Sequence, residues 1–414
     1  MRKTTSFLMA LLAFLAFPVL QAKPQTLTVL YSFAGGTDGG NPFAGLVIDK
    51  DGNLYGTTVQ GGDLACSSGF GCGTVFKLDK TGRETVLYSF TDVPDGSLPL
   101  AGLVRDKEGN LYGTTADGGS GNCYGSIGTL VGCGTVFELD KTGNESVLYS
   151  FRDTPDGSEP VAGLVMDKEG NLYGTAKAGG SSSFGIVFKI DATGKETVLH
   201  SFSGIDGGIP EAGLVMDKER TLYGTTVAGG SSIFGTVFKL DTIDKETVLH
   251  SFINVPDGGS PKAGLVMDKE GNLYGTTFEG GASGYGAVFK VDRSRKETVL
   301  HSFSGLDGAI PFAGLVMDRK GNFYGTTGYG GASFRPPNSI GAGTVFKVDT
   351  TGTESVLHSF SGMDGAGPQA GLVMDKEGNL YGTTAFGGTY DYGTVFKLTL
   401  NCEQMHQCEG HSGQ

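Results

Sequence analysis

The chain of 414 residues contains 72 Gly, 26 Phe and 15 Tyr but no Trp. Glycine is far above its usual ~7%, and without a Gly-x-y period or many prolines this excludes a collagen-like or proline-rich chain. The net charge of −13 argues against a nucleic acid or an anionic membrane as partner, because both require a basic surface. This composition favours many short strands joined by tight turns.

Residues 1–22 are typical of a secretory signal peptide. Arg2 and Lys3 give the positive start, an apolar run extends from Phe7 to Leu20, and Ala22 is a small residue suited to the cleavage position. The apolar run is too short for a stable membrane span. We therefore predict a mature chain without a transmembrane segment that is secreted or resides in the periplasm or cell envelope.

Six cysteines form three close pairs in the sequence: Cys66 with Cys72, Cys123 with Cys133, and Cys402 with Cys408. An even number in an exported chain favours disulfides. The last pair lies beside His406 and His411, but its spacing matches no established zinc pattern, so a disulfide is preferred there as well. Each bridge closes a short loop and is expected to rigidify that loop rather than hold the fold.

An internal repeat dominates the sequence between residues 26 and 400. Its unit is AGLVMDKEGNLYGTT, a Gly-Gly pair, GTVFKLD, a Thr-Gly turn, ETVLHSF and DGxxP. The tyrosine of YGTT marks seven copies at a base spacing of about 50 residues: Tyr55, Tyr112, Tyr173, Tyr223, Tyr274, Tyr324 and Tyr381. Copies 1, 2 and 6 carry insertions, all between Gly-Gly and GTVF, which indicates a surface loop.

Each unit contains four candidate strands, AGLVMD, LYGTT, TVFKLD and ETVLxSF, and no helical period. The fourth segment is out of phase, because its first copy, Thr28 to Phe33, precedes every AGLV and none follows Leu398. A ring closes if residues 26–33 complete the last sheet, whereas an open solenoid gives no reason for this order. We predict an all-β seven-bladed propeller of four-stranded antiparallel blades over residues 23–400, followed by a polar tail, 401–414.

The unit resembles the Gloeo/Verruco (GloVer) repeat family of exported bacterial proteins. The resemblance rests on VLYSF, DG-x-x-P-x-AGLV, GNLYGTT, Gly-Gly and GTVFK, and it extends over residues 26–400. It implies an exported repeat protein, with no established reaction and no catalytic residues to transfer. The D-x-x-G-N-L-Y strands are also similar, more weakly, to NHL and gluconolactonase-like propellers.

An aspartate before each inner strand is the most regular polar feature of the repeat: Asp38, Asp95, Asp156, Asp206, Asp257, Asp307 and Asp364. A ring of carboxylates could bind a cation such as calcium. Each Asp is followed by Gly, however, and a structural Asx turn is the preferred interpretation. His200, His250, His301 and His358 occupy a position that elsewhere holds Tyr31, Tyr88 and Tyr149, which favours packing over metal binding. No cofactor is predicted.

A specific ligand requires residues that differ between blades. Two positions near the loops that follow the second and fourth strands vary in this way: between Pro and AGLV (Phe43, Leu100, Val161, Glu211, Lys262, Phe312, Gln369) and between Thr-Thr and Gly-Gly (Gln60, Asp117, Lys177, Glu279, Tyr329). The candidate binding set is Gln60, Asp117, Lys177, Glu211, Lys262, Glu279 and Tyr329; the alternative is solvated surface variation.

Two functions remain open. The preferred hypothesis is a binding or scaffold module that takes an extracellular or envelope protein or glycan on its loop-rich face. The alternative is an extracellular lyase or hydrolase acting on a polysaccharide or lactone, with Asp117, Glu211 or Glu279 as acid or base.

Overall fold

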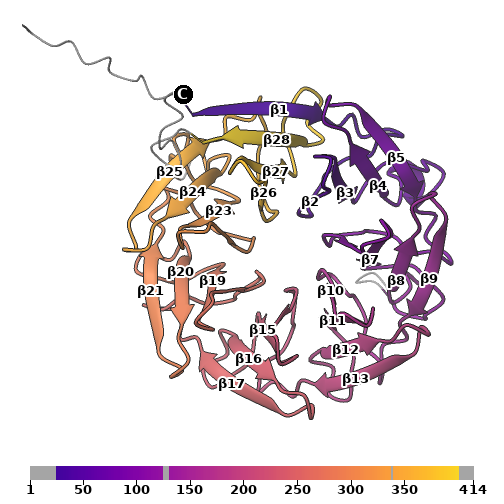
Figure 1. The fold of residues 1–414 in the computed structure, drawn as a ribbon, viewed down its shortest axis with the longest axis horizontal. Coiled ribbons are helices and arrows are strands. Elements are labelled where there is room, and N and C mark those ends of the chain that lie inside the picture. The colour runs from indigo at the N-terminus through magenta and orange to yellow at the C-terminus, as the bar shows by residue number, and fades with distance from the viewer. Residues whose placement is uncertain (1–24, 125–129, 337–338, 401–414) are drawn as a thin grey trace, which may run out of the picture.

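Each repeat of the sequence forms one four-stranded antiparallel sheet, a blade, and the seven blades surround a common axis (Figure 1). The computed structural model describes residues 25–124, 130–336 and 339–400. Within these ranges there is no α-helix, only a short 3-10 turn, η1 (Ser67–Gly69). No helix in the same ranges is long and apolar enough to cross a membrane.

The inner strand of each blade is only two residues long, shorter than the AGLVMD segment expected from the sequence. The glycine of that segment lies against the backbone of the preceding blade: a Cβ on Gly102 would lie 3.3 Å from the carbonyl oxygen of Gly45. These glycines form a collar around the axis, and the Ala-Gly-Leu segment therefore cannot continue the ladder. The inner strands are β2 (Val47–Ile48), β6 (Val104–Arg105), β10 (Val165–Met166), β14 (Val215–Met216), β18 (Val266–Met267), β22 (Val316–Met317) and β26 (Val373–Met374).

The second and third strands are the buried centre of each blade. In β11 and β12, Gly174 pairs with Phe188, and a Cβ on that glycine would lie 2.6 Å from the phenylalanine ring. The second strands are β3 (Leu54–Thr58), β7 (Leu111–Thr115), β11 (Leu172–Ala176), β15 (Leu222–Thr226), β19 (Leu273–Thr277), β23 (Phe323–Thr327) and β27 (Leu380–Thr384). The third strands are β4 (Thr74–Leu78), β8 (Thr135–Leu139), β12 (Ile186–Ile190), β16 (Thr236–Leu240), β20 (Ala287–Val291), β24 (Thr344–Val348) and β28 (Thr394–Thr399).

The outer strands follow one another around the rim of the ring (Figure 1). Each pairs with a third strand through a register shift, such as the one at Val75/Phe76, and such bulges increase strand twist. The outer strands are β5 (Glu84–Ser89), β9 (Glu145–Ser150), β13 (Glu196–Ser201), β17 (Glu246–Ser251), β21 (Glu297–Ser302), β25 (Glu354–Ser359) and β1 (Thr26–Ser32).

The ring closes through its first strand, as the order of the repeats predicts. β1 pairs with β28 in antiparallel register, from Thr26 opposite Thr399 to Ser32 opposite Thr394. The first strand thus supplies the outer strand of blade 7, and blades 1 to 6 run from β2 to β25 in groups of four.

Neighbouring blades are joined by the same aromatic contact at all seven junctions. The phenylalanine after an outer strand packs edge-on against a phenylalanine of the next third strand, with Phe90 and Phe137 5.1 Å apart. The other pairs are Phe33–Phe76, Phe151–Phe188, Phe202–Phe238, Phe252–Phe289, Phe303–Phe346 and Phe360–Phe396. All are buried, so the hydrophobic core lies between blades as much as within them.

Two of the three predicted disulfides are present, Cys66–Cys72 and Cys123–Cys133. Both lie in the insertions of blades 1 and 2. Cys402 and Cys408 belong to the tail, which lies outside the described residues, as does the expected signal peptide.

Candidate functional site

The two ends of the ring differ in construction. Antiparallel strands place the tight turns after inner and third strands at one end, and the connections after second and outer strands at the other. We call these the hairpin end and the loop end. All the residues that the sequence singles out as variable lie at the loop end.

The repeated aspartates secure the loop end of each outer strand. Tyr88 donates its hydroxyl hydrogen to Asp95 at 2.7 Å, and the backbone N–H and hydroxyl of Thr91 donate to the same carboxylate. Equivalent pairs are Tyr31–Asp38, Tyr149–Asp156, His200–Asp206, His250–Asp257, His301–Asp307 and His358–Asp364. A structural turn thus accounts for these carboxylates, and histidine and tyrosine fill the same position.

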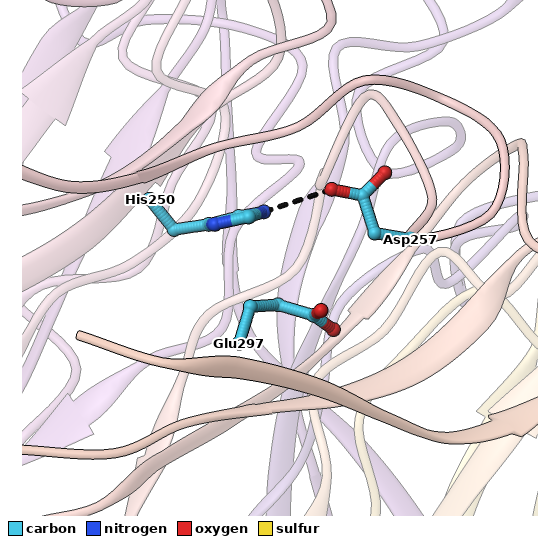
Figure 2. Close-up of side chains that lie close together, drawn as sticks. All are labelled: His250, Asp257 and Glu297. Carbon is cyan, nitrogen blue, oxygen red and sulfur yellow. Dashed lines mark hydrogen bonds and ion pairs between the residues drawn. The ribbon is translucent and has the colours of Figure 1, made fainter. Parts of the chain in front are cut away.

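A second carboxylate approaches six of these seven pairs from the next blade. The exception is His358–Asp364, because β1 of blade 7 has Leu27 where the other outer strands have glutamate. Figure 2 shows Glu297, the first residue of β21, beside the hydrogen-bonded pair of His250 and Asp257 from blade 4, whose ring and carboxylate atoms are 2.9 Å apart. Its Oε1 is buried and has no hydrogen-bond partner among the described residues. Burial, and next the negative charge of Asp257, raises the pKa of Glu297 to about 7.

We call each outer-strand glutamate and the pair beside it a rim cluster. In two rim clusters the three potential metal-ligand atoms lie within 4.8 Å of one another: His250, Asp257 and Glu297, and His301, Asp307 and Glu354. One imidazole and two carboxylates suit a cation such as zinc better than calcium, which takes six to eight oxygen ligands. The sequence does not reveal these clusters, because Glu297 stands 40 positions after Asp257 in another repeat. Only the alignment of the first residue of each outer strand could have pointed to them.

Three of the predicted loop-end residues belong to one continuous track across blades 4, 5 and 6. Lys262 forms an ion pair with Glu211 at 3.3 Å and lies 4.8 Å from the ring centre of Phe278. Phe278 packs on Phe312 at 5.0 Å, and Phe312 packs on Tyr329 at 6.3 Å. Phe278 is not among the predicted residues, because it follows β19 directly and its sequence context resembles that of a core residue of the strand.

Asp117 and Lys177 lie in a second, smaller cluster at blades 2 and 3. Lys177 forms an ion pair with Glu159 at 2.6 Å, and Glu159 is absent from the predicted set. Burial raises the pKa of Asp117 to about 6, with further contributions from Glu159 and Asp92, while Lys177 acts in the opposite direction.

The remaining two predicted residues make more local contacts. Glu279 accepts a hydrogen bond from the hydroxyl of Ser260 at 2.8 Å. Gln60 pairs through its backbone with Gly40 and joins neither cluster through a side-chain contact among the described residues.

Exposed apolar side chains are concentrated at the loop end. Among the described residues, every exposed large hydrophobic except Ile243 and Val356 lies in a loop after a second or an outer strand. Ile205, Leu306 and Met363, which precede aspartates of the repeat, are 84%, 63% and 88% exposed.

These features define a class of protein first: a seven-bladed β-propeller with one apolar end. More specifically, the chain belongs to the Gloeobacter/Verrucomicrobia repeat family, because the sequence model of that family matches residues 18–131 and 120–337. This confirms the resemblance found in the sequence. No curated protein matches the chain.

Solved structures share the fold at low sequence identity. The extracellular domain of BT4673 from B. thetaiotaomicron is 9% identical with a TM-score of 0.54, over 90% of this chain and 40% of that longer one. A gluconolactonase from Xanthomonas campestris is 14% identical with a TM-score of 0.46, over 91% of this chain and 90% of that one. A luciferin-regenerating enzyme is 13% identical with a TM-score of 0.45, over 72% of this chain and 90% of that one. The similarity to the BT4673 domain supports the fold alone.

Proposed function

We propose that the protein is an exported binding module that takes an extracellular or envelope protein or glycan on its loop end. The observation that carries the proposal is the concentration of exposed apolar side chains there, opposite a charged hairpin end. The aromatic track of Phe278, Phe312 and Tyr329 adds rigid rings of the kind that enrich interfaces. Two disulfides in loops at the same end suit an oxidising compartment.

The test removes the apolar side chains without touching the blades. A variant with Ile205→Ser, Leu306→Ser and Met363→Ser changes three equivalent exposed positions, and Ile243→Ser, 78% exposed at the hairpin end, is the control. Pull-downs from the envelope fraction and medium, together with a glycan array, measure partner capture. We expect the triple variant to lose at least about tenfold in apparent affinity, a 1.4 kcal/mol effect, and the control to retain it.

Equal thermal unfolding of the three proteins shows that the fold is intact. Capture that survives the triple substitution, or wild-type protein that retains nothing in either screen, contradicts the proposal.

One observation favours the enzymatic alternative, the raised pKa of the half-buried Asp117 beside Lys177. A carboxyl group of this kind can act as an acid or base on a polysaccharide or lactone. Turnover in a lactone and polysaccharide screen that falls at least about a hundredfold in Asp117→Asn, a typical loss for a general acid or base, supports this function. Turnover that neither this change nor Glu211→Gln affects removes both residues from consideration.

A further inference from the structure

The hairpin end carries a cleft between blades 4 and 5 that the loop-end function does not use. Its volume is about 890 Å³. Leu249, Met267 and Met317 supply apolar surface, while the turns that follow β14, β18 and β20 supply charged side chains at its mouth.

The repeat provides its own comparison for this cleft. The equivalent space between blades 5 and 6 is about 220 Å³, and that between blades 6 and 7 is about 110 Å³. One difference is the first residue of the second strand, which is Leu273 in blade 5 but Phe323 in blade 6. The ring of Phe323 lies 4.3 Å from that of Tyr274 and occupies space that stays open at the blade 4–5 junction. Blade 7 has leucine at this position, Leu380, and the smaller space there is lined by Leu400 instead.

The turn after β20 is more basic than its equivalents. Its residues Arg293 and Arg295 line the cleft and are exposed, whereas blade 6 has Thr350 and Gly352 at the same positions. Arg295 has φ of +68°. Four other blades with this turn have glycine there, and left-handed backbone costs about 1 kcal/mol or more for a residue with a Cβ. Blade 5 therefore has an arginine side chain at a position whose left-handed backbone favours glycine.

The cleft is lined by five basic and four acidic side chains, and three of the acidic ones accept hydrogen bonds within their own turns. Within the described ranges, the side chains of Lys218, Lys269, Arg293 and Arg295 form no ion pair or hydrogen bond. The carboxylates of Asp217, Asp268 and Asp292 instead accept hydrogen bonds inside their own turns. A free basic rim around an apolar floor is unusual in a chain of net charge −13.

We propose that this cleft binds an organic anion, with a carboxylate, sulfate or phosphate group held by Arg293 and Arg295 and a hydrophobic or sugar ring held on Met267 and Leu249. Guanidinium groups bind such oxyanions with paired hydrogen bonds, and the adjacent apolar side chains accommodate the ring. This ligand site is independent of the proposed loop-end function, because it lies at the opposite end of the ring.

Calorimetric titration of the purified protein tests the proposal with three probes: 1,5-naphthalenedisulfonate, trigalacturonate and inorganic sulfate. We expect one or both ring-bearing anions to bind more tightly than sulfate, and to bind more weakly at high salt. Preference for the naphthalene or the sugar probe identifies the ring. Arg293→Thr with Arg295→Gly converts the turn to the residues of blade 6 and should weaken binding at least about tenfold.

Two further variants separate charge from shape. Arg83→Thr with Arg319→Thr removes the same charge from exposed positions at the hairpin end outside this cleft and should leave the affinity within about twofold. Leu273→Phe keeps every charge but fills the cleft as Phe323 does in blade 6, and it should weaken the ring-bearing probes.

Thermal unfolding verifies that each variant is folded. Equal losses in the two arginine variants, unchanged affinity in Leu273→Phe, or no binding of either ring-bearing probe overturns the proposal.

Discussion

At the scale of single residues, the glutamates that begin the outer strands are perturbed in the same way in six blades. Burial raises the pKa of each to about 7: Glu84, Glu145, Glu196, Glu246, Glu297 and Glu354. In each of these carboxyl groups Oε1 is buried without a partner among the described residues. A protonated carboxyl is neutral beside the neighbouring aspartate, whereas a carboxylate there meets a like charge.

This arrangement predicts a stability that falls as the pH rises. A glutamate whose pKa is about 7 in the folded protein, against 4.5 when unfolded, binds extra protons only when folded. Its stabilising contribution is therefore full below pH 4.5 and is lost as the pH rises through 7. Because six glutamates share this shift, Glu297→Gln should remove about one sixth of their combined effect on the free energy of unfolding as the pH rises. Denaturant unfolding between about pH 4.5 and 8.5 measures this difference.

The control for this experiment is Glu377→Gln, an exposed glutamate in a turn at the hairpin end. Parallel stability profiles for the wild type and both variants would show that Glu297 does not titrate in this window.

At the scale of elements, the closing strand should behave like any internal outer strand. Phe33 follows β1 and packs 5.1 Å from Phe76 of blade 1, and Phe202 follows β13 and packs 5.1 Å from Phe238. Both residues are fully buried. Phe33→Ala and Phe202→Ala should each lower the free energy of unfolding by about 3–5 kcal/mol, because each leaves a cavity at a blade junction.

Denaturant unfolding of the two variants measures the difference between the junctions. A cost for Phe33→Ala that is several kcal/mol below that for Phe202→Ala would mean that β1 is not part of the ring in solution.

The strands could be predicted from the sequence because the same four-strand pattern occurs seven times, once in each repeat. The alternation of apolar and polar residues in segments such as TVFKL predicted the strands. The extra copy of the fourth-strand segment at Thr28 to Phe33 predicted that the ring closes through the first strand. Contacts between blades could not be predicted in the same way. The approach of Glu297 to Asp257 and the space left by Leu273 depend on how consecutive sheets are rotated, which no single repeat encodes.

At the scale of the whole molecule, the position of the chain break within the ring should be interchangeable. β28 and β1 are third and outer strands of one blade, so the described chain is interrupted where blades 1 to 6 have a tight turn. Joining Leu400 to Gln25 by a short Gly-Ser linker and opening the chain between Thr351 and Gly352 moves the break to the equivalent turn of blade 6.

We expect this permutant to unfold in one cooperative transition with Tm within about 5 °C of the wild type, a change of only one or two kcal/mol. Calorimetry measures both properties. Two separate transitions, or an aggregated product, would show that the blades are not equivalent in the way that their sequences suggest.

The glycine collar sets how closely the blades approach the axis. At six of the seven glycines, Gly45 and Gly102 among them, an added Cβ would lie 2.8 to 3.3 Å from a carbonyl oxygen of the neighbouring glycine, whereas at Gly371 it would lie at 3.7 Å, an ordinary contact. Adding an eighth unit by gene duplication would stretch this collar and separate the glycines, while alanines in their place would push it outward in the same direction. The smallest residue of the repeat thus lets the seven blades approach the axis closely, and a larger side chain there would favour a wider ring.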